Sequence, residues 1–297
     1  MKAFIHWTTS AYQADDPLAI SSNHLILAYN VQRYKQFYSG YSMKLPLKGG
    51  LPYRVDNQLI EIQPSRYFLT NYGREMECLP CQPGAETLLV TFSPDLLCDV
   101  VSNHHFSHQM LLENHKTNRQ HIHFCENSYA ISHTLHFYLQ TLVAEMRAYE
   151  QDYSTSSADI FFHLAAHVLK EQAVIQKQIE QVNATYRVTR EELYRRAAAA
   201  YEFLCDQWDS NLSLEEIARH ACLSPFHFNR TFREIYGQAP IAFFKSIKLQ
   251  KARHLLASGQ WNITEVALRC GYNDVQTFSK AFKRAWKIPP SAVIADA

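Results

Sequence analysis

Hydrophobic residues follow a strand-like pattern over the first hundred positions. Short apolar and aromatic runs are separated by Pro, Gly and Asn, which predicts β-strands joined by turns. The strands expected from these runs cover 24–29, 58–62, 67–69 and 87–92, and Asp56-Asn57 suits a hairpin turn between 53–55 and 58–60. Several short, closely spaced strands predict a small antiparallel barrel or sandwich.

The spacing of apolar residues becomes helical beyond residue 130. They recur every three or four positions in two segments, which the polar stretch 149–157 separates. We expect one face of these helices to cover the strand domain and another to meet a second copy of the chain, so that about 128–182 forms a homodimer. Helices that only cap their own domain are the alternative. The recurring residues are Leu135, Leu139, Leu142, Val143, Met146, Ile160, Phe161, Leu164, Ala165, Val168, Val174, Ile175 and Ile179.

The last third of the chain carries signals that start and stop helices. A Ser, Thr or Asn three residues before a Glu forms a capping box, Pro suits the first helical position, and Gly suits the left-handed residue after a helix. We also expect a long helix at about 240–258. The predicted starts are the boxes Thr189–Glu192, Ser213–Glu216 and Asn262–Glu265 and the caps Ser224 and Asp274, and the predicted stops are Gly237 and Gly259.

A pattern of two short helices around a turn occurs twice, at about 213–237 and 262–286. Within it, Leu214–Ala218 matches Ile263–Ala267. The offset is 49 residues in the first helix and 50 in the second, so we expect one extra residue in the second turn. Each copy is typical of a helix-turn-helix unit, whose second helix enters the major groove of DNA.

Polar residues on the second helix of each copy favour DNA as the partner. The positions expected to face outward carry hydrogen-bond donors and few carboxylates, which suits phosphates and base edges. A helical hairpin repeated only for packing is the alternative. The outward positions are His227, Asn229, Arg230 and Arg233 in the first copy and Gln276, Thr277, Ser279, Lys280 and Lys283 in the second.

The distribution of charge points the same way. Residues 1–185 hold 13 Lys and Arg against 17 Asp and Glu, a balance of −4, and residues 186–297 hold 16 against 11, a balance of +5. A basic third joined to a mildly acidic remainder suggests that one part meets a polyanion, although an excess of this size also arises by chance.

At these residues the chain strongly resembles the AraC/XylS family of bacterial transcription regulators. The resemblance covers roughly 190–297 and implies an all-α domain of seven helices, in which two helix-turn-helix units flank the long helix and read successive major-groove segments about 34 Å apart. The matching motifs are Ile217-Ala218, Leu223-Ser224, Phe232-Arg233, Tyr236–Pro240, Lys248-Leu249, Lys251–Arg253, Leu255-Leu256, Ile263–Ala267, Gly271-Tyr272, Phe278–Lys283 and Pro289–Ser291.

The resemblance also implies which residues meet DNA. Arg233 and Lys283 suit phosphates, and the apolar Phe226 and Val275 suit contact with a thymine methyl group. The family commonly has an aromatic-Arg pair after its last Pro-Ser, where this chain has Ala292-Val293. The implied contacts with bases and nearby phosphates are Phe226, His227, Asn229 and Arg230 in the first unit and Val275, Gln276, Thr277 and Lys280 in the second.

The first part of the chain resembles, less specifically, the cupin-like sensor domain of the same family. The expected fold is therefore α+β: an N-terminal cupin-like β-barrel with two following helices over 1–182, a linker at 183–189, and the helical DNA-binding domain over 190–297. The resemblance implies a cytoplasmic activator that binds double-stranded promoter DNA, contacts RNA polymerase and takes a small-molecule effector in its N-terminal domain. We cannot nominate the effector-binding residues from the sequence.

Other chemistry in the sequence is weak. Cys78 and Cys81 have the spacing of redox and metal sites, but without a second pair we expect two structural thiols. His121 and His123 lie in a His-rich stretch, where a solvated loop is expected rather than a cupin-like metal site, because a Glu follows too soon. No phosphate loop or nucleophile elbow is present. We therefore expect no cofactor, no metal, no catalytic residues and no enzymatic activity.

Composition also indicates the cellular compartment that we expect for the protein. No apolar run approaches the roughly 20 residues that cross a bilayer, and the start of the chain lacks an apolar block, so neither a membrane segment nor a secretory signal is expected. Seven scattered Cys suit a reducing compartment. The competing hypothesis is a small-molecule or metal receptor whose helical third docks a protein instead of DNA.

Overall fold

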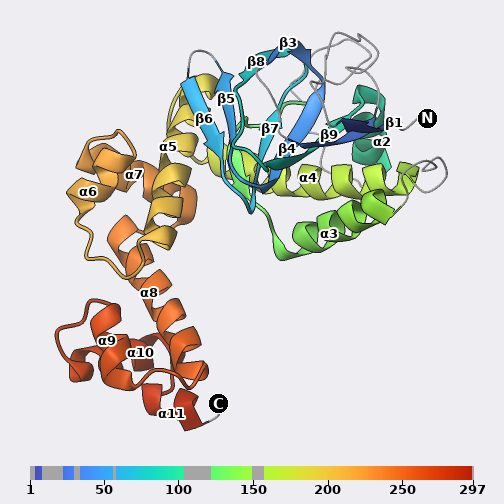
Figure 1. The fold of residues 1–297 in the computed structure, drawn as a ribbon. Coiled ribbons are helices and arrows are strands. Elements are labelled where there is room, and N and C mark those ends of the chain that lie inside the picture. The colour runs from blue at the N-terminus through green and yellow to red at the C-terminus, as the bar shows by residue number, and fades with distance from the viewer. Residues whose placement is uncertain are drawn as a thin grey trace. The chain divides into compact units, whose positions relative to one another are not determined.

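The structure, a computed structural model, describes residues 4–8, 23–29, 34–55, 58–103, 122–148 and 157–295. The chain divides into two compact units, Met1–Gln176 and Lys177–Ala297 (Figure 1). The boundary falls inside the long helix α4 (Ser157–Glu180), and each unit has a core of its own.

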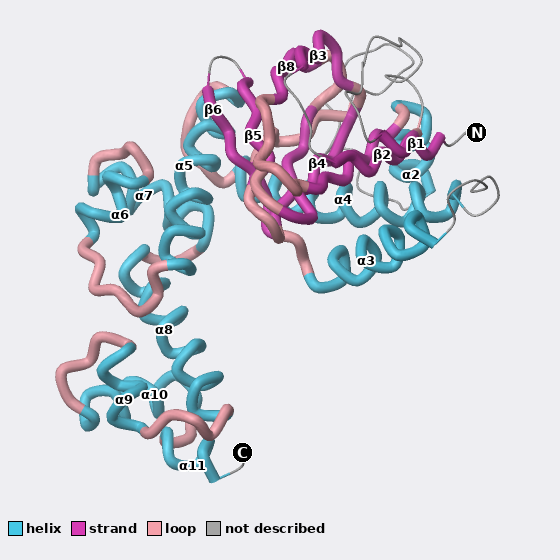
Figure 2. Tube along the Cα trace, in the orientation of Figure 1, coloured by secondary structure: helices cyan, strands magenta, loops and turns pink. Residues whose placement is uncertain are grey.

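The first unit contains two β-sheets (Figure 2). Six strands pair in the order β1-β2-β9-β4-β7-β10 and four in the order β3-β8-β5-β6. The described strands are β1 (Phe4–Thr8), β2 (His24–Tyr29), β3 (Tyr34–Ser39), β4 (Tyr41–Lys48), β5 (Leu51–Val55), β6 (Gln58–Ile62), β7 (Arg66–Thr70), β8 (Arg74–Cys78), β9 (Glu86–Phe92) and β10 (Ser128–Ala130).

This arrangement corrects the expected barrel. Over the described strands no pairing joins one sheet to the other, so the unit has two separate sheets instead of a closed barrel. The strand predictions themselves are confirmed, because β2 and β6 have the predicted bounds and β7 and β9 contain the other two segments. Val55 pairs with Gln58 across the predicted hairpin, whose turn lies outside the described residues.

Helices α2 (Pro94–Asn103), α3 (His133–Ala148) and α4 pack on one face of the six-stranded sheet. Alternate residues of β4 and β9 meet apolar residues of these helices in the largest core, as the period of two in a strand requires. The predicted apolar positions of α3 and α4 are buried or partly buried, except Val174, which is 56% exposed. A purely periodic argument fails at Val174 because its spacing does not show which side of the helix meets the sheet.

The second unit is helical, and its seven helices confirm the expected number. The last four of these helices pack around a core that includes Leu249, Leu256, Phe278 and Phe282. The helices are α5 (Arg187–Asp206), α6 (Leu214–His220), α7 (Pro225–Tyr236), α8 (Pro240–Ala257), α9 (Ile263–Arg269), α10 (Val275–Trp286) and α11 (Pro290–Ala295).

The start of α5 differs from the prediction. Thr189 lies inside the helix, whose N-cap is Tyr186, without a side-chain hydrogen bond to the cap. Glu192, the expected partner of Thr189, instead accepts hydrogen bonds from Arg195 at 2.7 Å and Arg196 at 2.8 Å. The carboxylate is therefore engaged farther along the helix, and no capping box forms at Thr189.

Within the described part of the chain, no helix combines the length and apolarity required to cross a membrane.

Candidate nucleic-acid interface

The first helix-turn-helix unit consists of α6 and α7. Glu216 N donates to Ser213 Oγ at 3.2 Å while Ser213 N donates to Glu216 Oε2 at 2.8 Å, which completes the predicted capping box. Ser224 Oγ accepts from His227 N at 3.3 Å and so caps α7. Gly237 ends α7 with φ +74°, as expected for a left-handed stop.

The second unit, α9 and α10, repeats these devices with different residues. Asn262 forms the predicted capping box with Glu265. Asp274 Oδ1 accepts from Thr277 N at 2.6 Å, and this hydrogen bond lowers the pKa of Asp274. Asp274 is therefore a structural cap of α10, which explains a carboxylate at the start of a helix that otherwise exposes donors.

The backbone follows the repeat more closely than the residue types do. Cys222 and Gly271 occupy matching turn positions with φ +52° and +76°. Gly237 and Lys287 occupy matching helix ends with φ +74° and +64°, so Lys287 is the structural partner that Gly237 lacks in sequence. Asn273 is the extra residue of the second turn, because Leu223 and Tyr272 make equivalent backbone hydrogen bonds before it.

α7 and α10 each expose one face to solvent, beginning at the N-terminal end of the helix. On α7, Phe226 is 82% exposed, whereas Phe228 and Phe232 are buried in the core below. The structure places every candidate contact residue on these two faces, with Asn229 and Val275 partly buried and the others exposed: Phe226, His227, Arg230, Arg233, Gln276, Thr277, Lys280 and Lys283.

Arg230 is the candidate reader whose guanidinium already has an acidic partner. Its Nε lies 3.0 Å from Glu234 Oε1, four residues along α7. The other carboxylate oxygen of Glu234 accepts from Asn183 N at 3.1 Å. Because the Arg230 side chain remains 49% exposed, this pair holds the guanidinium on the surface of α7 without burying it.

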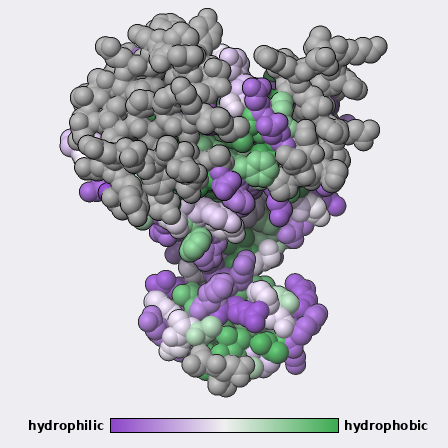
Figure 3. Space-filling view, turned by 90° about the vertical axis from the view of Figure 1, so that its right-hand side faces the viewer, coloured by the Kyte–Doolittle hydropathy of each residue, from purple (hydrophilic) through white to green (hydrophobic). Residues whose placement is uncertain are grey.

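Two exposed cations on α10 and at its C-cap were not among the sequence candidates. Arg284 lies one helical turn beyond Lys280, and Lys287 follows at the C-cap of α10. Helical spacing alone would have suggested Arg284, since positions four apart share a face. Figure 3 shows hydrophilic side chains over much of the helical unit at the bottom of the view, interrupted by apolar groups.

A buried lysine connects the two halves of the helical unit. Lys248, on α8, is 5% exposed and donates to Ser210 O at 2.7 Å and Cys270 O at 3.1 Å. Ser210 precedes α6, and Cys270 is the C-cap of α9. The ammonium group therefore fixes both helix-turn-helix units to the helix between them. In the sequence, Lys248 stands out only through the family resemblance, because its burial depends on packing.

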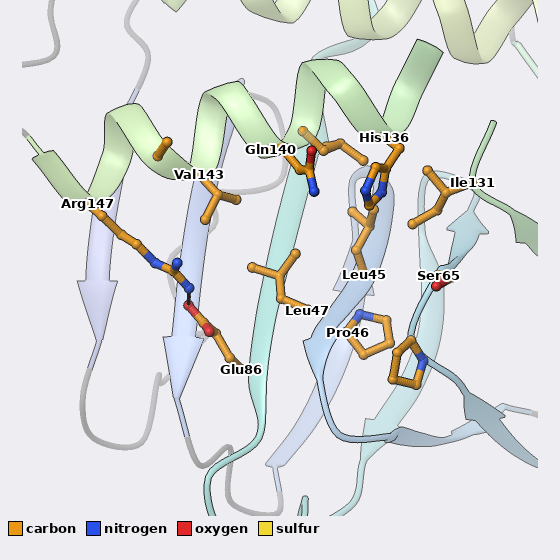
Figure 4. A pocket seen from close by; sticks show the side chains of 13 residues that line it. Leu45, Pro46, Leu47, Ser65, Glu86, Ile131, His136, Gln140, Val143 and Arg147 are labelled. Atoms are coloured by element: carbon orange, nitrogen blue, oxygen red, sulfur yellow. Dashed lines mark hydrogen bonds and ion pairs between the residues drawn. The ribbon is translucent and has the colours of Figure 1, made fainter. Parts of the chain in front are cut away.

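The sheet-containing unit, Met1–Gln176, has a cavity of about 420 Å³ between α3 and β4 (Figure 4). Arg147 and Glu86 form an ion pair at one end, and His136 lies near the other (Figure 4). The hydroxyl group of Tyr29 hydrogen-bonds with this ion pair, and the pKa of Tyr29 is raised, chiefly by burial. The walls combine apolar side chains with a few polar groups, as small-molecule sites usually do. Besides Glu86, His136 and Arg147, the residues that line the cavity are Leu45, Pro46, Leu47, Pro64, Ser65, Ile131, Leu139, Gln140, Val143 and Ala144.

Among the described residues, no three or more His, Cys, Asp or Glu side chains gather in a manner that could hold a metal ion. His123 is described, but His121 and the histidines at 104, 105, 108 and 115 lie outside the described residues. The metal alternative for the His-rich stretch thus stays untested.

Two helix-turn-helix units mounted on one connecting helix define the class of a double helix-turn-helix domain. Residues 217–295 match a family model described as a helix-turn-helix domain, and the resemblance of this part of the chain to the AraC/XylS regulators is confirmed.

Three similar proteins illustrate this relationship. The chain is 28% identical to the regulatory protein PocR of Salmonella typhimurium over 149 residues, which cover 48% of this chain and 49% of PocR. It is 26% identical to the transcriptional activator RhaS of Escherichia coli over 163 residues, 54% of each chain. The C-terminal domain of AraT, a response regulator from Geobacillus stearothermophilus, is 28% identical, with a TM-score of 0.33 over 34% of this chain and 85% of that structure. The chain thus spans about half the length of the curated relatives it matches.

Proposed function

We propose that the protein is a sequence-specific DNA-binding transcription regulator of the AraC/XylS type rather than an enzyme. The observation that carries this proposal is the pair of equivalent solvent-exposed helix faces, on α7 and α10, both rich in donors. Lys248 on α8 contacts the helix-turn-helix units that contain them, through Ser210 before α6 and Cys270 after α9. Double-stranded promoter DNA offers such a pair of helices two successive major-groove segments. We assign the DNA-binding domain to 190–297, the linker to 183–189 and the sensor domain to 1–182.

Different side chains on each face suit different groups on DNA. Arg230 can donate two hydrogen bonds to a guanine, and Gln276 and Asn229 have the amide geometry that suits adenine. Phe226 supplies apolar contact at the exposed start of α7. The remaining contacts assigned to the interface are His227, Val275, Thr277 and Lys280 toward bases and nearby phosphates, and Arg233 and Lys283 toward phosphates.

The test begins with selection of bound sites from a random DNA library by the full chain. Arg230→Ala and Lys280→Ala should each weaken binding to the selected site about 5- to 150-fold, corresponding to the roughly 1–3 kcal/mol of one good base contact. Lys170→Ala, which removes an exposed cation from α4, is the control and should leave binding unchanged. Affinity should also fall steeply with salt as counterions are released. If both variants bind as tightly as the parent, the assigned faces do not read DNA.

The first unit supports a sensor role. Its two sheets form a cupin-like domain in our proposal, and the cavity between α3 and β4 offers space for a small-molecule effector. Its apolar walls and the Arg147–Glu86 pair suit a mostly apolar compound with one polar end. Effector binding would change which half-sites a dimer reaches and, with contact to RNA polymerase, would activate transcription in the cytoplasm.

Helices α3 and α4 supply the surface proposed for the homodimer. Phe137 and Tyr138 on α3 are 64% and 44% exposed, and the Tyr138 ring stacks on His163 of α4. Phe137→Glu should shift the sedimentation coefficient from dimer to monomer. Phe226→Glu makes the same change at an exposed aromatic residue of the helical unit, on α7, and should leave the dimer intact. Equal sedimentation of both variants and the parent would refute this surface.

A further inference from the structure

The loop that follows β8 brings two thiols together at the edge of the first unit. Cys78 is the last residue of β8 and is completely buried, whereas Cys81 lies three residues later and is partly exposed. Leu79 N donates to Pro52 O at 3.0 Å and so anchors the loop to β5. Exposed residues flank Cys81 on both sides, so solvent reaches it while Cys78 stays in the core.

The two sulfur atoms are aimed at the same place. Cys78 Sγ lies 3.6 Å and Cys81 Sγ 4.0 Å from the carbonyl oxygen of Leu79. The thiols also hydrogen-bond to each other, which lowers the pKa of Cys81 and raises that of Cys78. The pair therefore combines a partly exposed thiol whose pKa is lowered with a buried neighbour whose pKa is raised. This division of roles is that of an attacking and a resolving cysteine.

Two groups beneath Cys78 partly offset the rise in its pKa. Tyr53 is the direct neighbour of Cys78 across the β5–β8 ladder, and its side chain hydrogen-bonds to Cys78. The ammonium group of Lys44 lies 5.8 Å from the centre of the Tyr53 ring, and its charge acts to lower the pKa of Cys78. Lys44 is 1% exposed, so water screens this interaction little.

We propose that Cys78 and Cys81 form a reversible disulfide on reaction with a peroxide. The Cys81 thiolate attacks one oxygen of hydrogen peroxide, the O–O bond breaks, and the departing hydroxide takes a proton from solvent to become water. The resulting sulfenic acid on Cys81 is attacked by the Cys78 sulfur, which loses its proton as the S–O bond breaks, and a second water molecule leaves. Sulfur is oxidised, peroxide is reduced, and a small thiol reverses the reaction by exchange.

The experiment treats the full chain with hydrogen peroxide, unfolds it, alkylates the remaining thiols and maps peptides by mass spectrometry. All variants carry Cys222→Ser, because Cys222 is an exposed thiol that would otherwise react and link two chains. The parent should lose two of its alkylatable thiols and yield a peptide joined between Cys78 and Cys81, and dithiothreitol should restore both. Cys81→Ser should keep its Cys78 thiol alkylatable under the same treatment, and Cys78→Ser should stop at a sulfenic acid on Cys81.

Because Cys78 is buried, Cys78→Ala replaces the serine variant if that protein fails to fold. Cys81→Ser alters only the partly exposed loop position and tests the proposal by itself. Lys44→Met should slow formation of the joined peptide, because it removes the positive charge that acts on the Cys78 sulfur. The proposal is overturned if no joined peptide forms, or if Cys81 is oxidised to the same products at the same rate with and without the Cys78 thiol.

Discussion

Replacing Lys248 with Met tests how the two helix-turn-helix units are held together. The substitution keeps most of the length and apolar stem of the side chain but removes the ammonium group. It leaves the carbonyl groups of Ser210 and Cys270 without the donor that they have at 2.7 and 3.1 Å. The cation also lies 4.7 Å from the centre of the Phe244 ring, a contact that a thioether replaces only in part.

The expected cost follows from these contacts. A hydrogen bond from a charged donor contributes about 1.5–3 kcal/mol. The two bonds to carbonyl groups are lost, together with a longer one to Asn211 Oδ1 at 3.5 Å. Burying the ammonium group, which also lowers the pKa of Lys248, costs several kcal/mol that Met does not incur. The difference is a destabilisation of about 2 kcal/mol, mainly the cost of leaving two carbonyl groups unpaired.

Urea unfolding followed by tryptophan fluorescence measures this loss, because three of the four Trp residues lie in the helical unit. Lys245→Met is the matched control, since Lys245 lies one turn earlier on α8 and is exposed. Its effect should stay within about 0.5 kcal/mol. Lys248→Met should also weaken binding to a site with both half-sites more than to an isolated half-site. If Lys248→Met destabilises the unit no more than Lys245→Met, then Lys248 does not hold the two units.

Three further perturbations give distinct results. Burial lowers the pKa of Lys44 to about 7 from 10.5, so the unfolded chain binds more protons between these values. The stability of the sheet-containing unit should therefore rise with pH across this window, by at most about 1.4 kcal/mol per pH unit. Hydrogen exchange of the β4 amides measures this stability as a free energy of opening. Lys44→Met should abolish the dependence of that free energy on pH. Gly271→Ala should lower the thermal stability of the helical unit more than Gly237→Ala does. Both glycines have positive φ, but only the Cβ added at Gly271 meets other atoms, Asn211 Oδ1 at 2.2 Å and Lys248 Nζ at 3.1 Å. Equal losses would contradict this. Glu234→Gln should tighten DNA binding by up to about fivefold by freeing Arg230 from an exposed ion pair worth about 0.2–1 kcal/mol, and weaker binding in a gel-shift assay would show that Glu234 instead orients Arg230 for the groove.

The helical unit could be predicted from the sequence because local rules determine most of it. Ser213, Asn262 and Asp274 cap their helices through side-chain hydrogen bonds to amides three residues away. Such signals need no knowledge of distant residues. Thr189 shows the limit of this reasoning, because it fits the same pattern while Glu192 binds the two arginines that follow it. A capping motif predicts a helix start only if its carboxylate has no better partner.

The sheets of the first unit were less predictable because their pairing is not local. The strand segments follow from alternation and turn residues, yet β4 pairs with β9, from Tyr41 opposite Phe92 to Lys48 opposite Glu86, residues that are 51 and 38 positions apart in sequence. Lys44 illustrates the difficulty, because a lysine inside an apolar run suggests an exposed edge. The structure buries it and bonds its ammonium group to Ser42 Oγ at 2.6 Å and Thr70 Oγ1 at 2.9 Å. Only the register of β4 against β7 brings the Thr70 hydroxyl group to the charge.

The turns of the two helix-turn-helix units show that the repeat preserves the backbone conformation but not the residue type. At each left-handed position one copy has glycine and the other does not: Cys222 matches Gly271, and Lys287 matches Gly237. A non-glycine residue in this conformation costs roughly 1–2 kcal/mol, so each unit carries one such strained position. What both copies preserve instead is the backbone path and the apolar pairs Phe228–Phe232 and Phe278–Phe282 beneath each recognition helix. The exposed residues above those pairs share the cations Arg230/Lys280 and Arg233/Lys283 and otherwise differ. The two units thus present the same helix geometry with different side chains, and under the proposed function this arrangement would suit an asymmetric DNA site.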